Sequence, residues 1–193
     1  VFIKNDAVAA CSAEMSFGNS QNYNSFLYIF VGTFLGGGLV LNNQLVNGKT
    51  GNAGAIGSLP FYNGSTQSQL ITQSSLYLLE RKLNDAGHNG QHIYESPSHW
   101  SCDTHSIEDW LSETARGLAF ATQCAMSLLD LDGVIIDGAI PDDVKNALVA
   151  HTQTAMETLD MRGLAQVHIS EGLVGRKAQS IGSANLALQA NYY

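Results

Sequence analysis

Three short apolar segments near the start of the chain constrain the fold most. They are FLYIFVGT (26–33), GGLVLN (37–42) and QLVN (44–47), and only glycines and the pair Asn42-Asn43 separate them. Each has the composition of a β-strand bounded by turn residues. The gaps are too short for the crossover that parallel strands need. The three segments therefore predict an antiparallel meander.

The rest of the chain alternates between helical and strand patterns. Helices are predicted at 5–17 (capped by Asn5 or Asp6), 69–84, 107–131, 141–159 and 178–190, and strands at 134–137 and 166–170. Helix 107–131 is apolar nearly all round in its second half, so we expect it to be the most buried helix. The 18 or so residues from His88 to His105 are polar and irregular, which indicates a functional flap or a mobile segment.

A meander followed by this alternation predicts an α/β fold with a mixed five-stranded sheet and helices on both faces. It is the pattern of a ribonuclease-H-like lobe, the unit duplicated in the actin, Hsp70 and hexokinase superfamily. We expect residues 1–193 to form one such lobe. No second copy is visible in the sequence, so we expect the other lobe upstream of Val1, where the lack of Met and of a lead-in suggests a fragment.

Charge and cysteine usage exclude some classes of function. The net charge of −8 argues against direct contact with nucleic-acid phosphates. No apolar run approaches the roughly 20 residues that span a bilayer, so no membrane partner is expected. Cys11, Cys102 and Cys124 are scattered without metal-type spacing, which favours a reducing, cytoplasmic setting.

Several motifs together resemble one family. They are Asn5-Asp6 followed by small residues, VGTFLGGGLVLN (31–42), GKTGNAGAIGSLP (48–60), VIIDGAIP (134–141) and AQSIGSANLAL (178–188). Their order and spacing resemble those of the ROK family, which includes sugar kinases and sugar-responsive repressors. The resemblance implies two ribonuclease-H-like lobes with a sugar in the cleft between them. It also implies ATP beside the sugar in kinases, and an N-terminal helix-turn-helix domain in regulators.

The sequence departs from the kinase pattern in several places. Ala55 and Ser58 stand where family kinases usually have a sugar-contacting Glu and a zinc-binding His. The cysteine-rich zinc motif is absent, so no metal is expected. The late glycine turn reads Asp137-Gly138-Ala139, and the resemblance implies that Asp137 would add repulsion and bulk near an adenosine or phosphate edge. These changes weaken the kinase interpretation.

The resemblance also implies candidate site residues. Asp6 matches the catalytic carboxylate of the kinases, the general base for the sugar hydroxyl, and it would be catalytic only in a kinase. Asn5, Asp6, Asn52 and Ser58 are the candidate sugar-binding residues. For Asn5 and Asp6 the alternative is a simple helix cap, and for Asn52 and Ser58 it is an ordinary surface loop.

Gly32, Thr33, Gly36 and Gly37 resemble the family's phosphate loop, where backbone amides and a hydroxyl hold an anion. Alternatively the glycines simply make the turn. We expect the geometry of this loop to be retained without nucleotide binding.

Two further groups of residues indicate a functional site less specifically. His88, His92, His99, Cys102, Asp103 and His105 could form a metal cluster, although ordinary solvated side chains are the commoner outcome. Trp100 and Trp110 could stack on a sugar, or they could anchor the long segment to the core.

The leading hypothesis is the non-catalytic effector domain of a ROK-type transcriptional regulator that senses a ligand, with a sugar-like small molecule as the expected effector. Under it no cofactor is needed, and DNA is contacted only through an N-terminal domain outside this chain. The alternative is the C-terminal lobe of a divergent sugar kinase, which would use ATP and magnesium. A second alternative is an oligomerisation module without a ligand.

We also expect self-association into a dimer or tetramer, with Met126–Leu131 as a candidate contact face.

Overall fold

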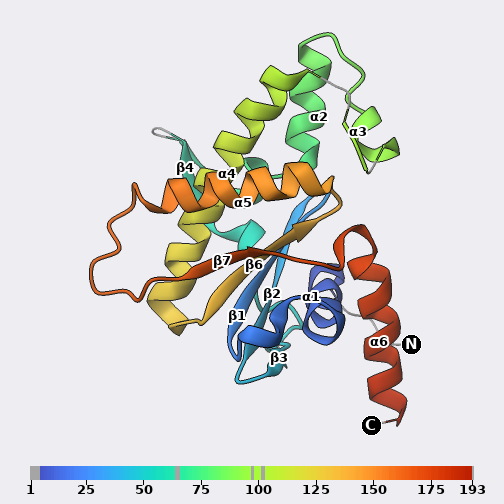
Figure 1. Cartoon of the computed structure of the whole chain (residues 1–193), viewed down its shortest axis with the longest axis vertical. Coiled ribbons are helices and arrows are strands. Elements are labelled where there is room, and N and C mark those ends of the chain that lie inside the picture. The colour runs from blue at the N-terminus through green and yellow to red at the C-terminus, as the bar shows by residue number, and fades with distance from the viewer. Residues whose placement is uncertain (1–4, 64–65, 97, 101–102, 193) are drawn as a thin grey trace.

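The computed structural model describes residues 5–192, apart from 64, 65, 97, 101 and 102. At its centre is a five-stranded mixed sheet with the order β3-β2-β1-β6-β7 (Figure 1). The strands are β1 (Phe26–Val31), β2 (Leu35–Leu41), β3 (Gln44–Val46), β6 (Gly133–Gly138) and β7 (His168–Glu171). β1, β2 and β3 are antiparallel, and β6 and β7 continue parallel to β1. The predicted sheet and its meander are confirmed.

The central strand divides the core into two layers. In β1, Leu27 and Ile29 face one hydrophobic cluster, whereas Phe26 and Tyr28 face the other. All six residues of β1 are buried, so the strand is covered on both faces and reads as one continuous apolar run.

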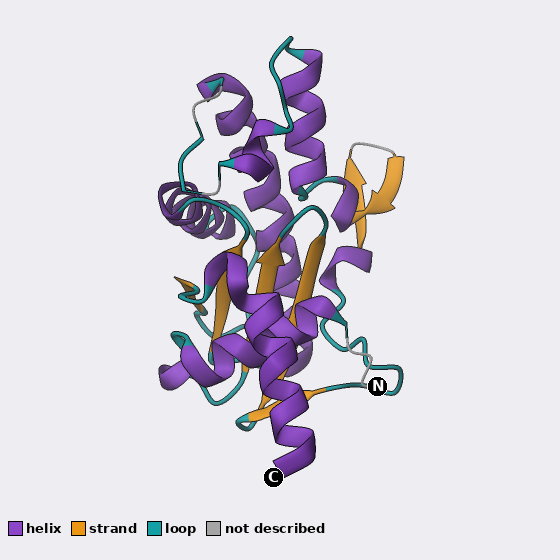
Figure 2. Cartoon of the chain, turned by 90° about the vertical axis from the view of Figure 1, so that its right-hand side faces the viewer, coloured by secondary structure: helices purple, strands orange, loops and turns teal. Residues whose placement is uncertain are grey.

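Helices cover both faces of the sheet. They are α1 (Asp6–Phe17), α2 (Leu76–Asp85), α3 (His92–Glu95), α4 (Thr104–Leu129), α5 (Asp142–Met156) and α6 (Ala178–Tyr192). Figure 2 shows the first and last helices together on one side of the sheet, and α1 packs mainly against α6 and β2. On the other side α4 packs against α5, and its first half extends beyond the sheet to meet α2 (Figure 1).

The described part of the segment between α2 and α4 contains the short helix α3 and is otherwise irregular and largely exposed, and a few buried side chains anchor it to the core. Ile93 of α3 is buried, and the Trp100 indole donates a hydrogen bond of 3.1 Å to the Ile93 carbonyl. Trp100 also packs edge-on against Trp110, whose indole donates to the Ser75 carbonyl at 3.0 Å. Both tryptophans are buried, so they anchor the segment rather than offer a surface for stacking on a sugar.

The structure differs from the sequence-based prediction at two further places. The helix predicted from Gln69 begins at Leu76, after a 3-10 turn, because the Ser75 side chain caps it by accepting from the Leu78 amide. The region before it forms an unpredicted hairpin of β4 (Pro60–Asn63) and β5 (Thr66–Gln69).

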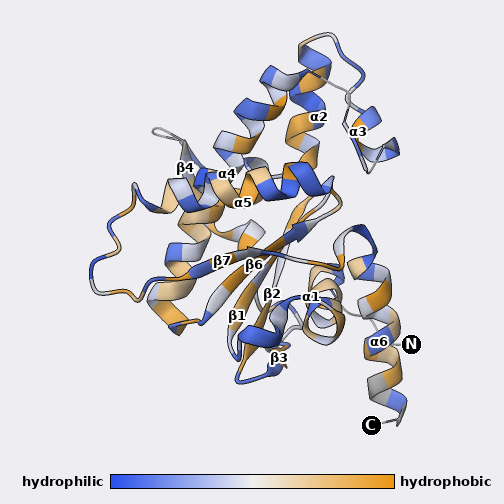
Figure 3. Ribbon diagram, viewed as in Figure 1, coloured by the Kyte–Doolittle hydropathy of each residue, from blue (hydrophilic) through white to orange (hydrophobic). Residues whose placement is uncertain are grey.

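Helix α4 is not the most completely buried helix. Eleven of its 26 residues are buried, compared with eight of the 12 in α1. In Figure 3 the second half of α4 is largely in the hydrophobic colours, yet Leu128 at its end is 82% exposed. Met126 and Leu131 are buried in the core, so the candidate oligomer face reduces to Leu128 and Leu129. Self-association stays a prediction.

No helix in the described part of the chain is long and apolar enough to cross a membrane.

Candidate functional site

An open cleft of about 440 Å³ lies where α1 begins, beside the β1–β2 turn and the start of α6. All eight site residues predicted from the sequence line it. They are Asn5, Asp6, Gly32, Thr33, Gly36, Gly37, Asn52 and Ser58. The folded chain therefore brings together residues that come from three separate motifs.

Asn5 caps α1 and also lines the cleft. Its side-chain oxygen caps α1, accepting from the amides of Ala7 at 2.9 Å and Val8 at 3.3 Å. Its Nδ2 donates to Oδ1 of Asn52 at 3.0 Å, which ties the helix start to the loop across the cleft. The cap therefore fixes the Asn5 side chain, so that its amide nitrogen is held in the wall of the cleft.

Asp6 is the first residue of α1 rather than its cap. Its Oδ1 accepts from the Ala7 amide at 2.8 Å. Its Oδ2 accepts from Nε2 of Gln179 at 2.8 Å. Gln179 comes from the first turn of α6 and also lines the cleft, although sequence reasoning did not find it. No local pattern signals a contact between residues 173 positions apart.

The turn between β1 and β2 is short and firmly held. Gly32 donates its amide to the Phe34 carbonyl at 3.3 Å. The Gly32 and Thr33 carbonyls accept from the Leu76 and Tyr77 amides, at 3.0 and 3.2 Å, so the start of α2 supports the turn.

The glycines after the turn lie inside β2, so the interpretation that they make the turn is wrong. Their role is to allow close approach. A Cβ on Gly36 would lie 2.5 Å from the Ala7 Cβ, and one on Gly37 would lie 2.5 Å from the Gly54 carbonyl oxygen. These glycines let α1 and the 52–58 loop close the cleft on both faces of β2.

Tyr94 of α3 links this turn to its surroundings. Burial and the Glu80 carboxylate, to which Tyr94 donates at 3.2 Å, raise the pKa of Tyr94 to about 12, against a smaller opposing effect of a hydrogen bond with Thr33. Tyr94 therefore stays a neutral hydrogen-bonding group beside the turn at physiological pH.

The loop residues Ala55 and Ser58 lie in the cleft wall, as the resemblance implied. Neither side chain is a usual zinc ligand.

In the described part of the chain no three His, Cys, Asp or Glu side chains come together as a metal site would require. His105 faces Asp109, His92 faces Ser96, and Asp103 caps α4 with its pKa lowered by hydrogen bonds from Ser106. Cys102 lies outside the described residues.

The charges of the side chains that line the cleft restrict what it can bind. Asp6 is its charged group, and no Lys, Arg or His occurs among the described residues that line it. The remaining polar groups are amides, hydroxyls and the peptide backbone. Such a lining can bind hydroxyl groups as donor or acceptor, but it provides no side-chain cation to neutralise a phosphate.

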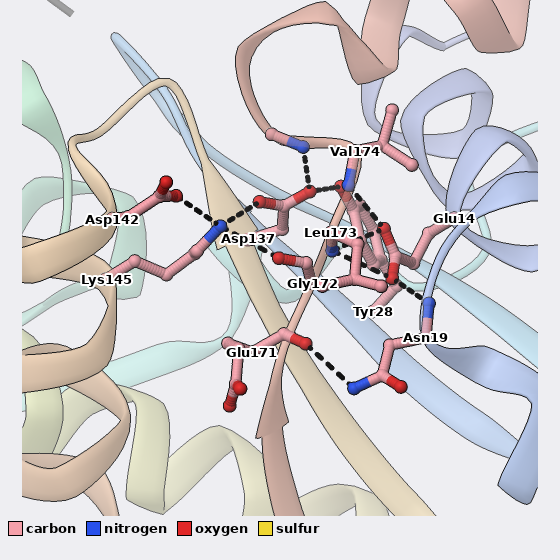
Figure 4. Close-up of polar contacts among 11 residues, drawn as sticks. Glu14, Asn19, Tyr28, Asp137, Asp142, Lys145, Glu171, Gly172, Leu173 and Val174 are labelled. Carbon is pink, nitrogen blue, oxygen red and sulfur yellow. Dashed lines mark hydrogen bonds and ion pairs between the residues drawn. The ribbon is translucent and has the colours of Figure 1, made fainter. Parts of the chain in front are cut away.

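Asp137 does not face a nucleotide edge, so that expectation is wrong. Its side chain is fully buried, and its polar contacts are drawn in Figure 4. One oxygen accepts from the Tyr28 hydroxyl at 3.0 Å and from the Gly175 amide at 2.8 Å. The other lies 3.6 Å from Nζ of the buried Lys145. Burial and Asp137 raise the pKa of Tyr28, so its hydroxyl remains a donor.

Glu14 forms a second buried anchor beside Asp137 (Figure 4). Its carboxylate accepts from the amides of Asn19 at 2.6 Å, Leu173 at 3.2 Å and Val174 at 3.2 Å. Together the two carboxylates hold the connection between β7 and α6, which leads directly to Gln179.

Comparison with known proteins shows what the chain is similar to. The sequence model described as "ROK family" matches residues 1–69, the segment that supplies most of the cleft. The chain is similar to the ROK family over these residues. Over its whole length it is 27% identical to the bifunctional enzyme NanE/NanK of Brucella melitensis, of which it covers 36%. It therefore spans about a third of the length of the curated relatives that match it throughout.

Solved ROK structures share the fold. The chain superposes on the ROK family glucokinase from Streptomyces griseus, in complex with glucose and AMPPNP, with a TM-score of 0.79 and 24% identity, covering 98% of this chain and 68% of that one. It superposes on a ROK family transcriptional regulator, a homolog of the E. coli MLC protein, with a TM-score of 0.75 and 22% identity, covering 95% of this chain and 50% of that one. At these identities the likeness shows the fold alone.

Proposed function

We propose that this chain is the C-terminal, non-catalytic effector lobe of a ROK-type transcriptional regulator, and that its cleft senses a sugar-like small molecule. The observation that carries this proposal is the state of Asp6. A general base needs a carboxylate oxygen directed at the hydroxyl that it deprotonates. Here each Asp6 oxygen already accepts a hydrogen bond, one from the Ala7 amide and one from Gln179. Both bonds hold the carboxylate at the cleft wall, and each oxygen keeps a second lone pair that can accept from a sugar hydroxyl, which supports a ligand-binding role.

The lining of the cleft supports the same proposal. Phosphoryl transfer depends on cations that stabilise the charge on the transferred group. The described lining contributes a carboxylate and no basic side chain. The Streptomyces griseus glucokinase binds glucose, which makes a neutral sugar a reasonable first ligand to test.

The alternative function is one lobe of a divergent sugar kinase. It is favoured by the TM-score of 0.79 to the glucokinase, which exceeds the 0.75 to the regulator. ATP and magnesium would then be needed, with cations from outside the described lining.

Three measurements on the full-length gene product test the choice. Thermal-shift titration with glucose, mannose, xylose and N-acetylglucosamine should find a sugar that raises Tm, and Asp6→Ala should abolish the shift. Asp85→Ala, which removes an exposed carboxylate of α2 outside the cleft, is the matched control. Because Asn5 still caps α1, Asp6→Ala should fold.

An ATP assay and a DNA assay complete the test. We expect no sugar-dependent release of ADP, and sugar-dependent binding of the protein to DNA from upstream of its own gene. Sugar-dependent ADP release that Asp6→Asn abolishes would overturn the regulator proposal in favour of the kinase. An unchanged thermal response in Asp6→Ala would remove Asp6 from the site.

A further inference from the structure

Helix α6 lies on the outside of the fold and depends on α1 for its position. It packs mainly on α1, which itself packs on β2 (Figure 2). Among the described residues of α6 only Ala178 and Gly182 are buried. The helix has 15 residues, a length at which an isolated helix is only marginally stable in water. Its folded state therefore depends on a small number of contacts with α1.

Side-chain hydrogen bonds join the two helices at both ends of their contact. Nδ2 of Asn185 donates to Oγ of Ser16 at 2.9 Å, away from the cleft. At the cleft, Nε2 of Gln179 donates to Oδ2 of Asp6 at 2.8 Å. In the described part of the chain, this is the α1–α6 side-chain bond whose acceptor is a carboxylate, the stronger kind of hydrogen-bond acceptor.

The start of α6 is held in place before the helix begins. The buried Glu14 carboxylate accepts from the Val174 amide at 3.2 Å, and the buried Asp137 carboxylate accepts from the Gly175 amide at 2.8 Å (Figure 4). Gln179 follows four residues later, in the first turn of α6. Its side chain thus reaches Asp6 from a backbone that is already fixed.

The hydrogen bond from Gln179 limits the orientation of the Asp6 side chain. Both residues line the cleft, and each Asp6 oxygen that accepts a protein hydrogen bond keeps a second lone pair for a ligand. Ordering one free side chain on binding reduces affinity by a factor of roughly 2–12. Because Gln179 orders Asp6 in advance, a ligand that contacts Asp6 avoids this loss.

We propose that Gln179 is a positioning residue that links the cleft to α6: it orients Asp6 for a ligand, and a bound ligand in turn strengthens the docking of α6 on α1. This inference rests on the proposed sensing function and describes its regulation. Linkage between two equilibria is reciprocal. The factor by which the Gln179–Asp6 bond improves ligand binding is therefore the factor by which the ligand stabilises that bond.

Hydrogen exchange of the full-length protein without ligand tests the contact itself. Gln179→Ala and Asp6→Ala remove the same hydrogen bond. Each should lower the protection of the amides of residues 183–186 about 2- to 12-fold, the range for one net hydrogen bond. The double variant should be no worse than either single variant. Ser180→Ala, at the exposed next position of α6, is the matched control and should keep wild-type protection. Losses that multiply in the double variant would overturn the link between Gln179 and Asp6.

A reversed pair separates the hydrogen bond from side-chain packing. Gln179→Glu places a second carboxylate opposite Asp6, so it should lower the protection of α6 more than Gln179→Ala does. Adding Asp6→Asn to Gln179→Glu supplies an amide donor opposite the new carboxylate and should restore most of the lost protection. No recovery in this double variant would overturn the hydrogen bond as the cause.

The ligand part of the proposal is tested with the sugar, among glucose, mannose, xylose and N-acetylglucosamine, that raises Tm. Gln179→Ala should weaken its binding about 2- to 12-fold by calorimetry. At saturation the same sugar should raise the protection of residues 183–186 by a similar factor, measured relative to the amides of β1, which report global unfolding. This extra protection should be absent in Gln179→Ala. Weaker binding by Gln179→Ala with the extra protection unchanged would mean that Gln179 contacts the ligand directly, and would overturn the positioning role.

The outcomes separate this proposal from the proposed function. If Asp6→Ala abolishes the thermal response but Gln179→Ala binds the sugar like wild type, the sensing function stands and the link to α6 is overturned. If none of the four sugars binds, the sensing function and the regulation that rests on it both fail. Exchange in the ligand-free variants would still decide whether Gln179 holds α6 to Asp6.

Discussion

Gly182 of α6 lies so close to Ala9 of α1 that a Cβ on the glycine would be only 1.7 Å from the Ala9 carbonyl oxygen. The first and last helices therefore touch backbone to backbone. Because Gln179 lies one turn before Gly182, this contact also determines where the Gln179 amide meets Asp6. The geometry of the cleft depends on a glycine that does not line it.

Gly182→Ala should destabilise the fold, because the obstacle is a backbone atom that cannot rotate away. We expect a loss of about 2–3 kcal/mol, at the upper end for an added methyl group, and a Tm lower by roughly 4–12 °C. Ser183→Ala, at the exposed neighbouring position, is the control and should be nearly neutral. Thermal unfolding followed by circular dichroism measures both. Equal Tm values for the two variants would contradict the close helix crossing.

Lys145→Met should cost about 3–5 kcal/mol, because it leaves the buried Asp137 carboxylate without its cation. The double variant Lys145→Met/Asp137→Asn should recover part of that loss, since it removes the isolated charge. Urea unfolding of the two single variants and the double variant gives the coupling free energy. Strictly additive losses would show that the 3.6 Å pair is not energetically coupled.

Glu14→Ala should be destabilising by about 2–4 kcal/mol, because the amides of Asn19, Leu173 and Val174 lose their buried acceptor. Glu171→Ala removes an exposed carboxylate nearby and should change stability little. Hydrogen exchange adds a local measurement: protection of the Leu173 and Val174 amides should fall in Glu14→Ala. Unchanged protection at these amides would refute the anchoring role of Glu14.

The thiol of Cys11 should resist alkylation in the folded protein. Burial, and secondarily the Glu14 carboxylate, raise the pKa of Cys11, so little thiolate forms at pH 8. Iodoacetamide followed by peptide mass spectrometry should label Cys11 at least about 100-fold more slowly in the folded chain than in urea. Cys124 is only partly buried and should react sooner, although burial raises its pKa as well. Labelling of Cys11 as fast as Cys124 would contradict its burial.

Local sequence patterns were sufficient to predict most of the strands of the central sheet. The run FLYIFV is apolar and, apart from Leu27, β-branched or aromatic, and the structure places β1 within two residues of the predicted end. The pair Asn42-Asn43 adopts the positive φ values of a tight hairpin turn. In contrast, the β4–β5 hairpin was missed because TQSQ (66–69) is wholly polar and carries neither strand periodicity nor apolar content.

Only part of the candidate site could be predicted from the sequence, because some of its residues are brought together only by the folded chain. The resemblance to a known family, carried by motifs in this part of the sequence, identified the residues from Asn5 to Ser58. Gln179 depends on a contact between distant segments, and an isolated glutamine in a helix gives no signal of its partner. The glycines of β2 were found, but their role in close packing became evident only once α1 and Gly54 were placed against them.

The Glu14 anchor has a consequence for the order in which the chain folds during synthesis. Glu14 and its donor Leu173 are separated by 159 residues. At a translation rate of about 5–20 residues per second, roughly 8–32 seconds pass between the appearance of the two. Throughout that interval α1 carries a carboxylate that cannot be buried without cost, so the nascent helix is held away from its final position. The wall of the cleft that Gln179 supplies can form only after the last helix has begun to be made.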